Sequence, residues 1–184
     1  AITIVNFDYP LVLSGMLGLY LLILAYSAIG LFMSSITKYQ VVAAIGTLAV
    51  LAVLNFIGDV GQDYDLVRHI TYWLSITGRA YPFIDGLVAS DNIFYFLIVI
   101  GFFLALSILK LNTEKTIMPL KIKVLKYSGI IFVILLLGYI SSTPYTKYYY
   151  DATYTKSNTL AKESQDVIKN LDGDLTITTY VNLL

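Results

Sequence analysis

The chain contains no cysteine among its 184 residues and only one histidine. The missing cysteines exclude disulfides, thiolate metal sites and cysteine nucleophiles. Charged residues are also scarce, at 13% against 58% hydrophobic residues. A phosphate-binding GxxxxGK[ST] loop, a GxSxG serine and a His/Glu cluster with metal-ligand spacing are all missing. The sequence therefore predicts that the chain is not an enzyme and that it binds no metal, cofactor or nucleic acid.

Four long apolar runs are the main feature that is present, at residues 11–35, 41–57, 93–111 and 127–143. Each is close to the roughly 20 residues that a helix needs to cross a bilayer core. None shows the polar face that a soluble helix presents every three or four residues. The interiors of the first three runs hold no Asp, Glu, Lys, Arg or His, which disfavours an ion-coupled carrier. We expect an α-helical integral membrane protein with four transmembrane helices.

Lysine placement predicts the orientation, because basic residues in short loops stay in the cytoplasm. Residues 110–126, which include the linker between the third and fourth runs, carry five lysines against Glu114 alone. That linker, residues 113–126, should be cytoplasmic, and so should the tight connection that carries Lys38. The connection at 58–91, the residues before the first run and everything after residue 143 should then lie outside.

The outer connection 58–91 is apolar enough to fold back onto the membrane. Trp73, Tyr72, Tyr81 and Phe83 suit the interface. We expect one or two short helices here, or a re-entrant hairpin, broken near Gly78 and Pro82. Within this segment His69 is interpreted as a solvated or interfacial side chain, with a pH sensor or ligand as the alternative.

Two polar features within the runs carry further expectations. Asn55 should make an interhelical hydrogen bond, with a substrate contact as the alternative. Small residues recur at three- or four-residue spacing in the first two runs, which lets helices approach closely. Examples are Ser14, Gly18, Gly30 and Gly46.

After the fourth run a cluster of tyrosines marks the exit from the bilayer, which indicates an interfacial belt or, alternatively, a platform for carbohydrate or aromatic ligands. A helix capped by Ser157 or Asn158 should run through Asp172 and end at Gly173. Residues 175–181 alternate like a strand. We therefore expect residues 144–184 to begin an extracytoplasmic α/β domain. The first residue is not Met and the last lies within the strand-like stretch, which indicates a piece of a longer protein. The tyrosines are Tyr145, Tyr148, Tyr149, Tyr150 and Tyr154.

Ordered motifs carry a resemblance to a known family. AIGLFMSSIT at 28–37, followed by YQVVAA at 39–44, resembles two successive spans of an ABC-2 type permease of the gliding-motility type. The outer stretch is similar too, through residues 83–86, Asp91 and the pair at 95–96, although Tyr81 and Asp85 stand where that family often has His and Arg. Residues 151–171 resemble the start of the partner substrate-binding-like subunit, with Ala161 in place of its usual Ser.

The resemblance implies a natural fusion in the bacterial inner membrane. Residues 1–112 would be the C-terminal part of a permease, 113–126 the linker, 127–143 an anchor and 144–184 the start of the accessory subunit. The implied function is the membrane-spanning component of an ABC transporter, arranged as a permease dimer and driven by a separate ATPase chain. A membrane-anchored scaffold or receptor that binds a surface polymer or partner protein without transport is the alternative.

Two sets of site residues follow from the same resemblance. The inner connection is a candidate ATPase-side loop, with a plain tight turn as the alternative. The outer stretch is a candidate gate segment. The first set is Ser35, Thr37, Lys38 and Gln40, and the second is Arg79, Tyr81, Phe83, Asp85 and Asp91.

Overall fold

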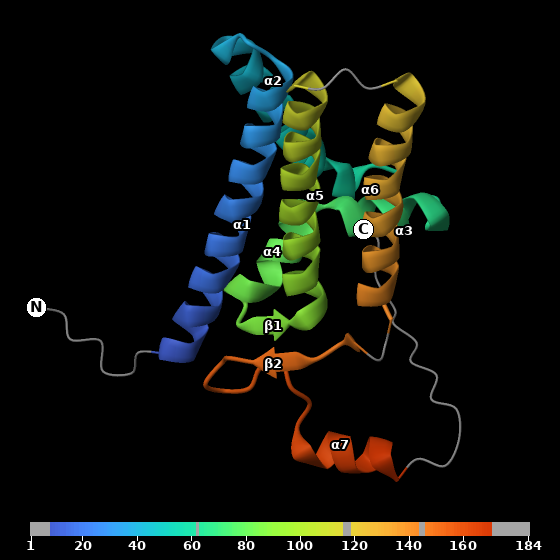
Figure 1. Cartoon of the computed structure of the whole chain (residues 1–184). Coiled ribbons are helices and arrows are strands. Elements are labelled where there is room, and N and C mark those ends of the chain that lie inside the picture. The colour runs from blue at the N-terminus through green and yellow to red at the C-terminus, as the bar shows by residue number, and fades with distance from the viewer. Residues whose placement is uncertain (1–7, 62, 116–118, 144–145, 171–184) are drawn as a thin grey trace, which may run out of the picture.

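A computed structural model describes residues 8–61, 63–115, 119–143 and 146–170, and four long helices dominate it (Figure 1). They are long and apolar enough to cross a membrane, which confirms the expectation of four long apolar helices. A short 3₁₀ turn, η1 (Ile57–Asp59), extends the second of them. The helices are α1 (Tyr9–Ile36), α2 (Gln40–Phe56), α5 (Ser90–Lys115) and α6 (Leu120–Ser141).

The start of α1 follows directly from its sequence. Asp8 is the N-cap, and its Oδ1 accepts a hydrogen bond from the Leu11 N–H at 3.3 Å. Pro10 lies in the first turn, where its missing N–H costs nothing. The helix ends where Thr37 adopts an extended conformation, and α2 begins three residues later.

The basic connection between the last two long helices is shorter than expected. Helix α5 continues to Lys115 and α6 starts at Leu120, seven residues before the predicted boundary at Tyr127. Lysine is a good helix former, so a Lys-rich stretch that is too polar for the bilayer still extends the helix. Hydropathy therefore predicted the apolar span from Tyr127, whereas the helix propensity of the lysines determines that α6 starts at Leu120.

The outer segment contains two short helices, as expected, namely α3 (Asp65–Leu74) and α4 (Ile76–Ile84). The expected break near Gly78 and Pro82 is wrong, because α4 runs through both residues. The chain breaks at Ser75, whose Oγ accepts a hydrogen bond from the Gly78 N–H at 3.2 Å and so caps α4.

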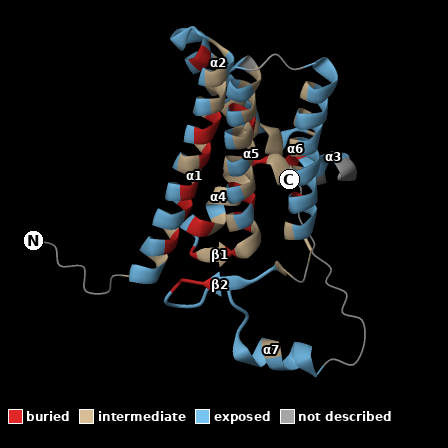
Figure 2. Cartoon of the chain, viewed as in Figure 1, coloured by how far each residue is buried: buried red, intermediate tan, exposed pale blue. Residues whose placement is uncertain are grey.

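The buried core lies where α1, α4 and α5 meet (Figure 2). Phe83 of α4 and Phe96 of α5 are fully buried there, with their ring centroids 6.3 Å apart. By contrast, most large apolar side chains of α2 and α6 are exposed on the surface of the bundle, as expected for helices surrounded by lipid. The core therefore fixes the outer segment against the bundle rather than filling the molecule.

The segment after α6 returns to the bundle. Strand β2 (Tyr149–Asp151) pairs antiparallel with β1 (Leu87–Ala89), which directly precedes α5. Figure 1 shows this two-stranded sheet beneath the helices, at the end opposite the α1–α2 and α5–α6 connections.

Helix α7 (Lys162–Lys169) is shorter than the helix expected in this region. Its N-cap is Ala161, so the expected cap at Ser157 or Asn158 is wrong. The backbone N–H groups of those two residues donate instead to side chains of the preceding loop. Gly173 and the expected strand at 175–181 lie outside the described residues, so the α/β domain stays a prediction.

Candidate functional site

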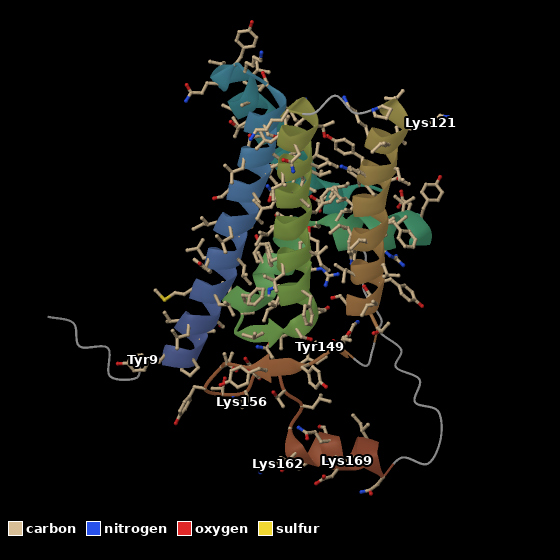
Figure 3. All side chains as sticks on the ribbon, viewed as in Figure 1. Tyr9, Lys121, Tyr149, Lys156, Lys162 and Lys169 are labelled. Carbon is tan, nitrogen blue, oxygen red and sulfur yellow. The ribbon has the colours of Figure 1, made fainter. Side chains whose placement is uncertain are left out.

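The candidate ATPase-side residues lie in and beside a three-residue turn. Ser35 Oγ donates to the carbonyl oxygen of Phe32 at 2.7 Å, and the Tyr39 N–H donates to Thr37 Oγ1 at 3.2 Å. Both bonds are local, one within the last turn of α1 and one within the turn itself. The turn lies at the same end of the bundle as the α5–α6 connection, and Lys121 near that connection is far from Lys162 and Lys169 of α7 (Figure 3).

An ion pair joins two of the candidate gate residues. Arg79 Nη1 donates to Asp91 Oδ2 and to Asn92 Oδ1, each at 3.1 Å. The guanidinium also lies over the Tyr95 ring, 5.6 Å from its centroid. Helix α4 is thereby fixed to the first turn of α5. Sequence reasoning named Arg79 and Asp91 but missed Asn92, which carries no signal except its place next to Asp91.

The other three candidate gate residues do not join this cluster. Phe83 is fully buried, and its carbonyl oxygen accepts a hydrogen bond from Ser14 Oγ at 2.8 Å. Tyr81 is exposed on α4. Asp85 is the C-cap of α4, and its carbonyl oxygen accepts a hydrogen bond from Asn158 Nδ2 at 2.8 Å. Helix α4 thus packs on the bundle through Phe83, while Tyr81 on the same helix remains exposed.

Asn55 makes the interhelical contact expected of it. Its carboxamide lies 3.3 Å from Tyr26 Oη of α1, and its Oδ1 accepts a hydrogen bond from Thr77 Oγ1 of α4. The same amide borders a cavity of about 460 Å³ between α2 and α4, which Thr77 and Tyr81 also line. This cavity lies beside the candidate gate residue Tyr81, and its lining combines polar side chains, including Asp59, with apolar ones.

Asp151 organises the loop that follows β2. Its Oδ1 accepts hydrogen bonds from the N–H (3.0 Å) and Oγ1 (2.6 Å) of Thr153. Its Oδ2 accepts from the Asn158 N–H at 2.9 Å and from Thr159 Oγ1 at 2.8 Å. Burial acts to raise the pKa of Asp151, but these four donors outweigh it and hold that pKa well below the ordinary value. Asp151 begins the stretch that resembles the partner subunit, but that resemblance did not disclose the donors at 158 and 159.

The same loop fastens the chain after α6 to the helical bundle. The Ala152 N–H donates to the carbonyl oxygen of Gly86 at 2.7 Å, and the Tyr154 N–H donates to Asp8 Oδ2 at 2.8 Å. Gly86 has a φ of +80°, and a Cβ there would lie 2.7 Å from Thr153 Cγ2. Only glycine fits this conformation and this close approach without strain.

The side chain of His69 lies outside the described part of the chain, so its two interpretations stay open. Across the described residues, no three His, Asp or Glu side chains lie close enough together to hold a metal ion.

The fold and these contacts define a multi-helix protein with four helices that are long and apolar enough to span a membrane and with a two-stranded sheet at one end of the bundle. No protein-family model, no curated protein and no solved structure matches the chain.

Proposed function

We propose that this chain is the membrane-spanning permease component of an ABC transporter, driven by a separate ATPase chain. The observation that carries the proposal is the outer segment. Helix α4 packs against α1 and α5 through Phe83, and a cavity lined by both polar and apolar residues lies beside Asn55. Within a membrane a non-helical break is acceptable only when it packs on protein or lines a wet cavity, and the buried Ser75 at this break borders the cavity.

Charge distribution supports the same proposal. Among the described residues, the basic side chains near the α1–α2 and α5–α6 connections include Lys38, Lys115 and Lys121, which supports a cytoplasmic assignment of that end. The outer sheet, α7 and the residues that follow are then extracytoplasmic in a bacterial inner membrane. In this arrangement the turn at residues 37–39 faces the ATPase, and a second permease copy completes the transport path.

The proposed mechanism needs no chemistry from this chain. Nucleotide binding brings two ATPase subunits together, and their movement tilts the permease helices. The cavity beside Asn55 then changes its access to the outer side. The residues assigned to this movement are the exposed side of α4, at Tyr81, and the Arg79–Asp91 pair that fixes α4 to α5.

One observation favours the scaffold alternative. The loop around Asp151 ties the segment after α6 to the bundle through the hydrogen bonds of Ala152 with Gly86 and of Tyr154 with Asp8, and α7 follows it with exposed charged side chains. A receptor that holds an envelope partner needs such a fixed outer platform and needs no ATPase.

Co-purification separates the two functions. The full-length protein is tagged, isolated from its native membrane with its neighbours, and reconstituted into vesicles. A permease brings an ABC ATPase with it, and the vesicles hydrolyse ATP. The variant Lys38→Glu should lower the recovery of that ATPase, whereas Lys162→Glu on α7 should not. Recovery without any ATPase, and vesicles without ATP hydrolysis, would reject the permease in favour of the scaffold.

A further inference from the structure

An open apolar groove separates the first turns of α5 from the last turns of α6. Its volume is about 340 Å³, and its walls are apolar side chains of both helices. Gly101 forms part of the floor, and a Cβ at that position would meet no atom within 4 Å. The walls include Phe94, Leu97, Ile134, Leu137 and Ile140.

A small polar recess adjoins the groove where α5 begins and α6 ends. Its volume is about 40 Å³, and it shares Ile98 and Ser141 with the groove. Arg79, Asp91 and Lys147 contribute two positive charges and one negative charge to its lining. Because Asp91 already pairs with Arg79, the charge of Lys147 is the excess charge of the recess.

We propose that one anionic phospholipid occupies this site, with an acyl chain in the groove and its phosphate beside Lys147. The occupant has to be apolar along two helical turns and negatively charged at one end, which is the chemistry of such a lipid. The groove extends over eight residues of each helix, 94–101 and 134–141, which corresponds to about 10 Å. That length fits within the roughly 15 Å of one bilayer leaflet.

The two parts of the site have different roles. An acyl chain fills the groove because its atoms restore dispersion contacts that an empty groove lacks. This contact does not distinguish one phospholipid from another. Selection for negative charge comes from Lys147, since basic residues at a membrane surface attract anionic headgroups.

The only tryptophan of the chain provides a local probe. Trp73 lines the polar recess and packs against Gly138 of α6. Phospholipids with brominated acyl chains quench tryptophan fluorescence on contact, so the full-length protein is titrated with brominated phosphatidylglycerol and brominated phosphatidylcholine. We expect quenching at about fivefold lower concentrations of the anionic lipid, and a loss of that preference at high salt.

Three variants and one competitor make the test decisive. Lys147→Gln changes an exposed residue and should remove the preference for the anionic lipid. Gly101→Phe should fill the groove and reduce quenching by both lipids. Gly129→Phe is the matched control, because a Cβ there also meets no atom within 4 Å but the residue does not line the groove. Inorganic phosphate should not compete.

Several results would overturn the proposal. Equal quenching by both lipids would show that the recess does not select charge. Competition by inorganic phosphate would identify an anion site without a lipid. The protein could also be a dimer in which brominated lipids do not quench Trp73 and which Gly101→Phe converts to monomers. That result would identify a second copy of the chain as the occupant.

Discussion

At the residue scale, the closest approach between the outer segment and the bundle is at Gly18. A Cβ at this position would lie 2.5 Å from Cβ of the fully buried Phe83. We predict that Gly18→Ala lowers the free energy of unfolding by about 1–3 kcal/mol, because the ring of Phe83 has no room to move away. Thermal unfolding in detergent measures the loss.

Gly15 is the matched control for this change. It lies one turn earlier on α1, and a Cβ there would meet nothing within 4 Å. Gly15→Ala should leave the midpoint of unfolding unchanged or raise it slightly, since alanine favours the helix. Equal midpoints for the two variants would contradict the tight contact with Phe83.

Asp151 gives a prediction about pH. Its carboxylate accepts four hydrogen bonds, and its pKa in the folded protein lies below the ordinary value of 3.8. A lowered pKa means that the stabilisation is complete above pH 3.8 and disappears as the pH falls further, toward the pKa of the folded state. The amide signals of Thr153 and Asn158 should therefore stay unchanged down to this pH and shift only below it.

Asp151→Asn should disorder the same loop at neutral pH. An asparagine side chain has one acceptor oxygen and an NH₂ group that faces donors, so at least two of the four bonds are lost. Hydrogen exchange of residues 152–159 measures the effect, and Asp166→Asn on the exposed face of α7 is the control. Unchanged protection in Asp151→Asn would refute the role of this carboxylate.

Residue-scale contacts were predictable only where the sequence isolates one polar side chain. Asn55 is the one amide in the second apolar run, so its need for a partner followed from its surroundings. The partners of Asp151 were not predictable in the same way, because two of them are backbone N–H groups that converge only after the loop has formed. Pairing of Arg79 with Asp91 also depends on the turn at β1, which brings α4 back to α5.

At the element scale, the antiparallel pairing of β1 and β2 joins the two halves of the chain. Ala89 lies opposite Tyr149, while the hydrogen bond from the Ser90 N–H to the Tyr148 carbonyl belongs to the neighbouring pair. Opposite residues of a non-hydrogen-bonded pair have Cα atoms about 4.5 Å apart, which a disulfide spans. We predict that the double variant Ala89→Cys with Tyr149→Cys forms a disulfide readily.

The native chain has no cysteine, so this experiment has no background. The control pairs Ala89→Cys with Tyr150→Cys, one residue out of register, where the side chains leave opposite faces of the sheet. Gel mobility without reducing agent, with and without an oxidant, detects the bond. Cross-linking of the control pair in preference to the first would show that the register differs.

Elements were predictable where composition dominates and were not where local hydrogen bonds compete. All four spans were located by their apolar length alone. The break between α3 and α4 was expected at Gly78 and Pro82, but capping by Ser75 moves it upstream. The start of α7 was expected at Ser157 or Asn158, but their N–H groups already bind Thr153 and Asp151.

At the scale of the whole molecule, the two ends of the bundle should lie on opposite sides of the membrane. Single cysteines at Lys38 and Lys121 mark one end, and single cysteines at Tyr154 and Lys162 mark the other. A membrane-impermeant maleimide should label only the second pair in intact cells, because lysine-rich connections are retained in the cytoplasm. Labelling of the first pair in intact cells, with protection of the second, would invert the topology.

The whole-molecule arrangement was only partly predictable from sequence. Lysine placement predicted which connections share a side, and they do share one end of the bundle (Figure 1). The return of β2 to β1 was not predictable, because three-residue strands such as Leu87–Ala89 are too short to show an alternating pattern. Because of this pairing, strand β2 of the segment after α6 packs against the helical bundle.

The most direct test of the permease proposal measures whether nucleotide bound to the ATPase changes the accessibility of the outer segment. A single cysteine replaces the exposed Tyr81 beside the cavity, and the full-length protein is reconstituted with its ATPase. The labelling rate is measured without nucleotide and with ATP trapped on the ATPase. The account predicts that trapping ATP changes this rate several-fold while a cysteine at Lys162 is unaffected. Identical rates at Tyr81 in both states would contradict it.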